Sequence, residues 1–245
     1  MPARLVAVPV YSEERYITRV MERIREFHKG DILVIDDGSP DRSGEILRSI
    51  PGIGLISHPV NRGYGASLID AFNYAIANGY DQLITIDCDE QHEPRHIPAL
   101  FRRLERGGVD IVSCSRYLQS SAADDAPPKD RFAINKKMTE MINGITGYGL
   151  TDSFCGMKGY RVAVLTPLRL TEDGYAFPLQ FWVQAFHFGL TVEEFPIARI
   201  YKNLDRKFGG ELDDPQRRFN HYFEVLRKEL AQWSISLPSE FIPTI

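Results

Sequence analysis

Three short runs of almost entirely apolar residues constrain the fold of this chain more than any other feature. They read LVAV at 5–8, ILVI at 32–35 and LITI at 83–86, and segments with helical spacing separate them. Strands of this kind are covered on both faces, as in a parallel sheet between two layers of helices. The sequence therefore predicts an α/β fold with a mostly parallel central sheet flanked by helices.

The same alternation continues along the chain and places its main elements. Ser12 is the expected N-cap of the first helix, and Gly30 is expected to end it. A mobile loop is predicted at 118–129 and an irregular segment at 146–160. Strands are expected at 4–10, 31–36, 53–57, 82–87, 109–115 and 191–200, and helices at 13–28, 43–50, 66–77, 94–106, 132–145, 178–188 and 215–233.

Composition narrows the class of protein. The chain has 245 residues, of which 43% are hydrophobic and 25% charged, as in one large globular domain with an extension. A net charge of −4 argues against a nucleic-acid partner. Three cysteines without a CxxC pair indicate a reducing cytosol. Because no apolar run approaches the roughly 20 residues of a membrane span, we expect a cytoplasmic protein that is at most peripheral at a membrane.

The strongest sign of a functional site is the segment from Thr85 to His92, which follows an apolar strand. In a doubly wound sheet, ligands bind at the carboxyl ends of the strands. Side chains two residues apart on an extended chain point the same way, so Asp87 and Asp89 could hold one hard cation such as Mg²⁺ or Mn²⁺. The alternative is an acidic turn that caps the helix beginning at Pro94.

A second acidic strand end reads Asp36-Asp37-Gly38-Ser39. Adjacent carboxylates point to opposite sides of a strand, so at most one of them can face a ligand. An Asx turn before the next helix is the competing interpretation.

Two further strand ends complete this edge of the predicted sheet. The glycines of Asn61-Arg62-Gly63-Tyr64-Gly65 permit close approach of the backbone, and the helix that follows favours an anion. A dinucleotide site is excluded, because no GxGxxG follows the first strand. That strand ends at Pro9, which is expected to leave Tyr11 and Glu13 exposed at the same edge, although an ordinary helix start also explains them.

Taken in order, VPVYSE, DDGS, NRGYG, DCDEQH and SRY at 115–117 resemble the family 2 glycosyltransferases, closest to the dolichyl-phosphate mannosyltransferase and polyprenyl-phosphate glycosyltransferase branch. The resemblance implies a Rossmann-like GT-A fold and an inverting, metal-dependent transfer from a nucleotide-sugar donor of the GDP-mannose or UDP-hexose type. It divides the chain into a nucleotide-sugar-binding half at 1–117, an acceptor-side half of the same domain at 118–213, and a C-terminal helix and tail at 214–245.

The resemblance also implies roles for individual residues. Pro9, Tyr11 and Glu13 would line the nucleotide pocket with Asn61 and Gly65, Asp37 would contact the base or ribose, and Asp87, Asp89 and Gln91 would hold Mg²⁺ or Mn²⁺ on the diphosphate. Asp89, Arg116, Arg131 and Gln180 are the candidate catalytic residues, with the two arginines facing phosphates.

The acceptor side is less regular. Gln180 stands where relatives often carry an acid and cannot accept a proton, whereas Glu172 or Asp173 could act as a base or form a solvated turn. A phosphate acceptor, with a second pKa near 6, needs positioning cations more than a base. Arg199, Arg206 and Lys207 are candidates to bind it, although the ending at 206–210 departs from the branch and weakens the case for a dolichyl-like acceptor.

Three alternatives remain open from the sequence. The aromatic and basic last helix could contact a membrane surface near a lipid-phosphate acceptor, dock against the domain, or form a homodimer. A haloacid-dehalogenase-like phosphatase also carries Asp-x-Asp after a strand, although normally after the first strand of its core. A nucleotide-sugar-binding protein without catalysis would explain Gln180.

Overall fold

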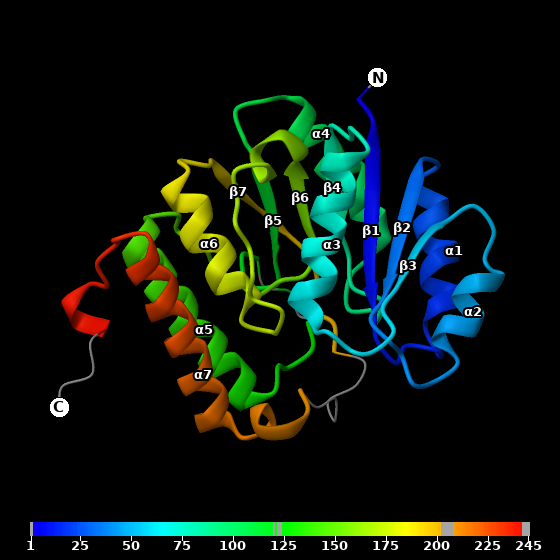
Figure 1. The fold of residues 1–245 in the computed structure, drawn as a ribbon. Helices are drawn as coiled ribbons and strands as arrows, with labels where there is room; N and C mark the ends of the chain where they lie inside the picture. The colour runs from blue at the N-terminus through cyan, green and yellow to red at the C-terminus, as the bar shows by residue number, and fades with distance from the viewer. Residues whose placement is uncertain (1, 120, 122–123, 202–207, 242–245) are drawn as a thin grey trace.

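The computed structural model describes residues 2–119, 121, 124–201 and 208–241, which form a single seven-stranded sheet with helices on both faces (Figure 1). The strand order is β3-β2-β1-β4-β6-β5-β7, and only β6 runs antiparallel to its neighbours. The strands are β1 (Arg4–Val10), β2 (Asp31–Asp36), β3 (Gly54–Ser57), β4 (Gln82–Thr85), β5 (Ile111–Ser115), β6 (Lys158–Arg161) and β7 (Val192–Pro196). The α-helices are α1 (Ile17–Phe27), α2 (Ser43–Ser49), α3 (Tyr64–Ala77), α4 (Ile97–Glu105), α5 (Lys129–Thr146), α6 (Phe177–His187) and α7 (Pro215–Gln232).

The two faces of the sheet bury separate apolar clusters, as the unbroken apolar runs predict. Along β1, Leu5 and Ala7 pack into the cluster under α3, α5, α6 and α7, whereas Val6 and Val8 pack into the cluster under α1, α2 and α4. This alternation follows from the two-residue period of a strand. The predicted α/β class and the mostly parallel sheet are confirmed.

The strand β6 is absent from the sequence-based prediction, which treats 146–160 as irregular. Its sequence, KGYR, has no apolar run, and β6 enters the sheet between β4 and β5 as an antiparallel strand. Lys158 is buried there with its ammonium over the Trp182 ring, and burial lowers the pKa of Lys158. A buried lysine is rare unless paired, so local pattern does not identify this strand.

The predicted start of the first helix is wrong, whereas its end, expected at about residue 28, is correct to within one residue. The helix begins at Ile17 rather than at residue 13, and no side chain caps it. Ser12 instead adopts a left-handed conformation (φ 58°), and its N–H donates to Ser39 Oγ. At the other end the helix stops at Phe27, before Gly30. The segment between β1 and α1 is therefore held against the loop after β2.

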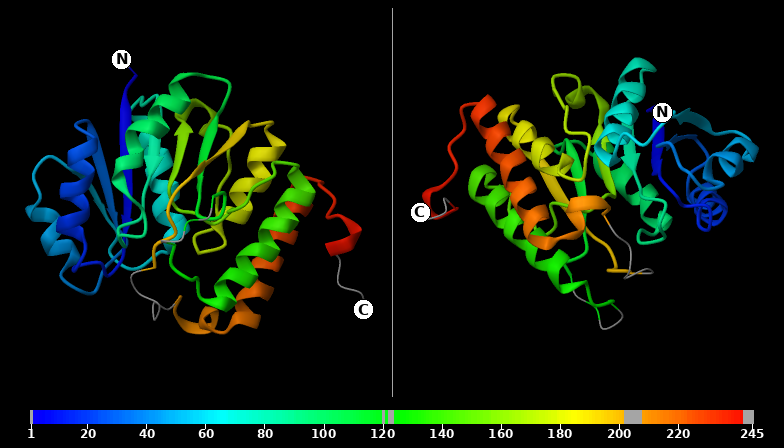
Figure 2. Two further views of the ribbon diagram at one scale, coloured as in Figure 1. Left: turned by 180° about the vertical axis from the view of Figure 1, so that it is seen from behind. Right: turned by 60° about the horizontal axis from the view of Figure 1, so that its bottom comes forward.

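The last helix, α7, docks against the domain in this structure. Figure 2 shows α7 beside α5 and α6, and Tyr222, Leu226 and Leu230 are buried in the shared cluster. The homodimer stays a prediction. Among the residues that the structure describes, no helix has the length and hydropathy required to cross a bilayer.

Candidate active site

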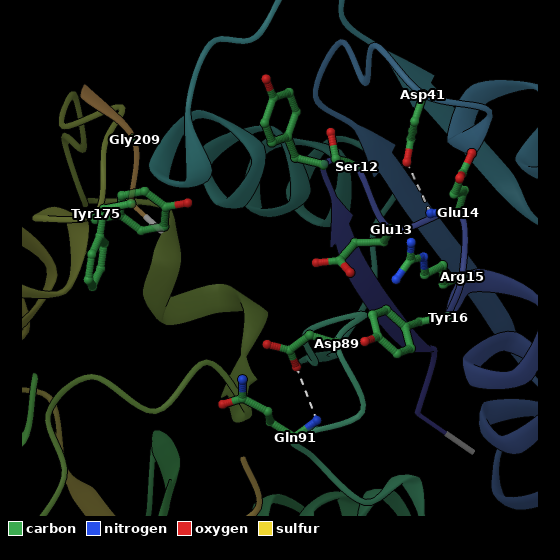
Figure 3. A pocket seen from close by; sticks show the side chains of 12 residues that line it. Ser12, Glu13, Glu14, Arg15, Tyr16, Asp41, Asp89, Gln91, Tyr175 and Gly209 are labelled. Atoms are coloured by element: carbon green, nitrogen blue, oxygen red, sulfur yellow. Dashed lines mark hydrogen bonds between the residues drawn. The ribbon is translucent and has the colours of Figure 1, made fainter. Parts of the chain in front are cut away.

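A cleft of about 400 Å³ opens beyond the carboxyl ends of β1 and β4 (Figure 3). Its floor comes from the turn after β1, one side from the turn after β4, and the other side from two segments of the acceptor-side half. The lining residues are Tyr11, Ser12, Glu13, Glu14, Arg15, Tyr16, Asp41, Asp89, Gln91, Tyr175, Phe208 and Gly209. The predicted edge of the sheet therefore carries a cavity.

Two carboxylates from different strand ends face this cleft. Figure 3 shows the side chains of Glu13 and Asp89 directed into the same open space. The backbone N–H of Glu13 donates to Ser43 Oγ at 2.9 Å, which fixes the turn after β1. The backbone N–H of Gln91 donates to Asp89 Oδ1 at 3.1 Å and fixes the turn after β4. The first hydrogen bond thus fixes the backbone of Glu13, and the second fixes the Asp89 carboxylate itself.

This donor set suits a hard divalent cation. Carboxylate and amide oxygens are the ligands that Mg²⁺ and Mn²⁺ prefer, and Glu13, Asp89 and Gln91 supply them on the cleft wall. Within the described part of the chain, no cluster of three or more His, Cys, Asp or Glu residues is arranged to hold a metal. Such a cation would therefore need oxygens from a bound substrate or from water to complete its coordination.

The two aspartates of the predicted pair, Asp87 and Asp89, have different surroundings, and their joint binding of one cation stays a prediction. The strand β4 ends at Thr85, and Glu90 adopts a left-handed conformation (φ 59°), so the chain turns within the motif. Asp87 does not line the cleft; its Oδ1 accepts a hydrogen bond from Tyr64 at 3.0 Å. Of the three predicted metal ligands, the structure brings Asp89 and Gln91 to the cleft.

Two buried residues behind the cleft wall, Tyr64 and His92, have shifted pKa values. Burial raises the pKa of Tyr64 well above its usual value, and Asp87 adds to the shift. Burial disfavours the charged imidazole of His92, but Cys155, Asp87 and Asp89 outweigh it and raise the pKa of His92 to about 9. Cys155 and the two aspartates therefore favour the protonated form of His92.

Asp37 is enclosed by the loop that precedes α3. Its Oδ1 accepts from the His58 ring at 2.6 Å and from the Arg62 N–H at 2.8 Å, and its Oδ2 accepts from Asn61 Nδ2 at 2.9 Å and from the Gly63 N–H at 2.8 Å. Neither Asp37 nor Asn61 lines the cleft. These four hydrogen bonds favour a role in anchoring the loop, and the predicted contact of Asp37 with a base or ribose stays a prediction.

The glycines before α3 serve packing within the chain. A Cβ at Gly63 would lie 2.3 Å from the Asp173 carbonyl oxygen, and one at Gly65 would lie 2.1 Å from that of Glu172. The Ala66 N–H at the start of the helix donates to the Asp173 oxygen at 3.1 Å. The predicted close backbone approach is present, with the segment at 172–173 as its partner, and the predicted preference of the helix start for an anion stays a prediction.

Arg116 forms a buried ion pair and does not face the cleft. Its Nε and Nη2 donate to Asp152 at 2.7 and 3.0 Å, and both side chains are almost fully buried. Burial opposes ionisation of Asp152, but Arg116 outweighs it and holds the pKa of that carboxyl below its usual value. A bidentate arginine–carboxylate pair is strong and directional, so Arg116 is better explained as a structural residue than as a phosphate ligand.

Three further acceptor-side candidates, Gln180, Arg199 and Glu172, are not among the residues that line the cleft. Gln180 is buried and donates or accepts hydrogen bonds with protein groups on each side of its amide. Arg199 donates from Nε to the Asp125 carbonyl at 2.6 Å. The side chain of Glu172 accepts from the Gly174 N–H at 3.0 Å, as in the predicted turn. The predicted Arg206 and Lys207 lie outside the described residues.

Arg131 lies behind one wall of the cleft. Its guanidinium stacks on the Phe208 ring at 4.9 Å, and that of Arg218 stacks on the same ring at 4.3 Å. The Phe208 ring also meets Tyr175 edge-on at 5.2 Å. Arg131 therefore supports the aromatic wall formed by Tyr175 and Phe208.

Of the predicted nucleotide-pocket residues in the first strand end, Tyr11 and Glu13 line the cleft, whereas Pro9 is buried within β1. Several further lining residues were not predicted from the sequence. Burial opposes ionisation of Asp41, but hydrogen bonds from Ser43 and Glu14 hold its pKa below the usual value. At Tyr175 the only local signal is the glycine before it, and at Phe208 it is the two glycines that follow. The missed residues are Ser12, Glu14, Arg15, Tyr16, Asp41, Tyr175, Phe208 and Gly209.

Comparisons with known proteins agree with this geometry. The family model described as glycosyl transferase family 2 matches residues 5–168. The chain is 28% identical over 209 residues to a polyprenol monophosphomannose synthase from Mycolicibacterium smegmatis, covering 82% of this chain and 78% of that protein. It is 26% identical over 220 residues to an undecaprenyl-phosphate mannosyltransferase from Micrococcus luteus, covering 84% of this chain and 87% of that protein.

Solved structures share the fold. The glucosyl-3-phosphoglycerate synthase from Mycobacterium tuberculosis, in complex with Mn²⁺, UDP and glucosyl-3-phosphoglycerate, superimposes with a TM-score of 0.69. The match covers 97% of this chain and 82% of that one at 19% sequence identity. A second structure of that protein contains Mg²⁺ and UDP, with a TM-score of 0.67 and 19% identity over 97% of this chain and 81% of that one. The predicted Rossmann-like GT-A fold is thereby confirmed.

Proposed function

Because the chain belongs to glycosyl transferase family 2 and is therefore a glycosyltransferase, we propose that it transfers a hexose from a nucleotide sugar to a polyprenyl phosphate in a metal-dependent reaction. Two relatives named for polyprenol and undecaprenyl-phosphate substrates support this class of acceptor. A donor of the GDP-mannose or UDP-hexose type is supported by the mannosyltransferase names and by UDP in the structures that share the fold.

The observation that carries the proposal is that carboxylates from two strand ends, Glu13 and Asp89, line one cleft at the carboxyl ends of the strands. Carboxylate oxygens are ligands that Mg²⁺ and Mn²⁺ prefer. A diphosphate is itself negative, so it would approach these carboxylates through a divalent cation. A site for a nucleotide sugar with Mg²⁺ or Mn²⁺ fits this lining.

Each side of the cleft then has a defined part in the reaction. A bound Mg²⁺ or Mn²⁺ supplies charge neutralisation for the departing nucleoside diphosphate. Asp89 and Glu13, with Gln91, would hold that cation. Tyr11 and Tyr175 are aromatic lining residues that would stack on the base or sugar, and Arg15 adds a cationic group to the lining.

The acceptor is a phosphate in this proposal because the chain offers little evidence for a general base. Gln180 has no titratable group, and Glu172 accepts a hydrogen bond from its own turn. A phosphate monoester is already largely ionised at neutral pH, with a second pKa of about 6. Its oxygen can attack the anomeric carbon directly once it is positioned, and inversion at that carbon follows from a single displacement. A lipid acceptor would bring the chain to a membrane surface, in keeping with a cytoplasmic and peripheral location.

The direct test uses the purified chain with Mn²⁺, radiolabelled GDP-mannose or UDP-glucose, and a short-chain polyprenyl phosphate. We expect labelled lipid in the organic phase. This product should be absent when Mn²⁺ is chelated, and absent when unphosphorylated polyprenol replaces the polyprenyl phosphate. Donor binding without transfer or donor hydrolysis would instead support a nucleotide-sugar-binding protein without catalysis. Hydrolysis of simple phosphate esters without a nucleotide sugar would support the phosphatase. In such an enzyme Asp87 would be the nucleophile, but Asp87 follows the fourth strand and accepts a hydrogen bond from Tyr64.

A further inference from the structure

A buried carboxylate on α7 organises a network of amides outside the cleft. Glu229 is 4% exposed, and its hydrogen-bond donors are neutral groups from three side chains. Gln180 Nε2 donates to its Oε2 at 2.8 Å, while Gln184 Nε2 and Trp233 Nε1 donate to its Oε1 at 2.8 and 2.6 Å. Burying a carboxylate is costly unless it is well hydrogen-bonded. Its place in the fold therefore requires an explanation beyond packing.

Glu229 determines which way each glutamine amide points. A carboxylate only accepts hydrogen bonds, so it selects the NH₂ group of each amide and turns the amide oxygen away. The Oε1 of Gln180 then accepts from the successive backbone N–H groups of Thr171 and Glu172, at 2.7 and 2.8 Å. The Oε1 of Gln184 accepts from the Arg169 N–H at 2.6 Å. Two amides on one face of α6 thereby hold neighbouring parts of one segment.

The part held by Gln180 continues directly into the cleft wall. The Asp173 carbonyl accepts from the Ala66 N–H at 3.1 Å, next to the glycines that need this close contact. Two residues later, Tyr175 lines the cleft, and its ring stacks on Tyr64 at 6.0 Å. The segment at 171–175 is thus the point where the acceptor-side half contacts the loop before α3.

We propose that Glu229 is a positioning residue for nucleotide binding, acting through Gln180 on the segment at 171–175. It orients the Gln180 amide, the amide fixes two backbone N–H groups, and the segment that follows places Tyr175 in the cleft wall. The C-terminal helix therefore contributes to the shape of the donor site without touching it. This inference rests on the proposed function, since it assumes that the cleft binds a nucleotide.

A matched pair of variants tests it. Gln180→Met and Gln184→Met each remove one hydrogen bond to Glu229 from the same buried helix, but only Gln180→Met releases the N–H groups of 171–172. With GDP and UDP as probes in the presence of Mn²⁺, we expect calorimetry to show about tenfold weaker binding for Gln180→Met, as loss of hydrogen bonds to a positioned segment implies. For Gln184→Met the change should be less than about twofold. In the transfer assay, KM for the nucleotide sugar should rise in Gln180→Met while kcat changes less.

Hydrogen exchange gives a second readout that does not need activity. Backbone amides of 171–172 should exchange faster in Gln180→Met and in Glu229→Gln, whereas Gln184→Met should affect mainly the amide of Arg169. Equal nucleotide affinity in the wild type and Gln180→Met, or equal losses in the two glutamine variants, would overturn the inference alone. A wild-type chain that binds neither nucleotide would overturn the proposed function and this inference with it.

Discussion

Two acidic strand ends of the same sheet have opposite surroundings. Asp37, after β2, accepts four hydrogen bonds from a loop of its own chain and is 3% exposed. Asp89, after β4, lies on the wall of a cleft that Glu13 also lines. Both aspartates follow apolar strands of the same sheet. The comparison shows that the partners of a carboxylate, more than its place in a motif, separate an anchoring residue from a candidate ligand.

Replacing Asp89, the carboxylate in the cleft, is the most severe test of the difference between the two strand ends. We expect Asp89→Asn to reduce transfer by about 10³-fold, since an interaction made to the reacting charges contributes up to about 4 kcal/mol. Its free energy of unfolding should change by less than about 0.5 kcal/mol, as for other partly exposed positions. Steady-state kinetics and urea denaturation measure the two quantities.

Glu90→Gln is the matched control for this prediction. Glu90 belongs to the same turn but pairs with Arg19, a mostly exposed residue. Near-normal transfer is expected for it, because exposed ion pairs contribute little. A fully active Asp89→Asn variant would remove the basis for assigning this strand end to the reaction.

Asp152 extends the comparison to a carboxylate with a charged partner. Asp152→Asn should lower the free energy of unfolding by about 3 kcal/mol, because it leaves Arg116 buried without its counter-charge. The pKa of Asp152 is depressed in the folded state, so its contribution is present above the unfolded value of 3.8 and is lost as the pH falls through the lower folded value. The difference between wild type and variant should be constant from about pH 5 to 8 and shrink below about pH 4.

Denaturation with urea at several pH values measures this difference. The double variant Arg116→Met/Asp152→Leu should recover much of the lost stability, since it removes both charges together. If the single variant were as stable as the wild type while transfer fell sharply, Arg116 would act on substrate phosphate, as the motif implies.

At the other strand end, Asp37→Asn should cost about 2 kcal/mol of unfolding free energy. Each Asp37 oxygen accepts two hydrogen bonds. The NH₂ group of asparagine would replace one of these oxygens, so two buried donors would lose their acceptor. Asp36→Asn is the matched control on the same strand end, because the asparagine oxygen can still accept the hydrogen bond that the Ser39 N–H donates to Asp36 Oδ1 at 3.1 Å. Unchanged stability together with a specific loss of nucleotide affinity would show that Asp37 contacts the ligand directly.

Sequence predicted the parts of this protein that depend on neighbours along the chain. Strands with apolar runs and helices with regular spacing are local patterns, and most of them are confirmed. The strand β6 escaped prediction because the surrounding sheet buries its Lys158. The positions of the strand ends were likewise predictable, which led to Glu13 and Asp89.

The partners of the site residues were not predictable in the same way, because they come from distant segments. Tyr64 hydrogen-bonds Asp87 from 23 positions away, and Glu229 holds Gln180 from 49 positions away. A motif specifies neither contact. The aromatic wall of Tyr175 and Phe208 depends on the packing of α5 and α7 as well.

Ligand-induced stabilisation gives the smallest effect and separates the two strand ends most directly. GDP or UDP with Mn²⁺, at about ten times its dissociation constant, should stabilise the wild type by about 1.4 kcal/mol, from mass action on the folded state. The same increment should persist in Asp37→Asn, measured from its lower baseline, and should disappear in Asp89→Asn. Thermal denaturation with nucleotide alone, Mn²⁺ alone and both together resolves the contributions. If the increment were lost in Asp37→Asn and kept in Asp89→Asn, the assignments of anchor and ligand would have to be exchanged. A ligand stabilises the folded chain only to the extent of its affinity for that state, so the variant that loses the increment is the one that has lost nucleotide affinity.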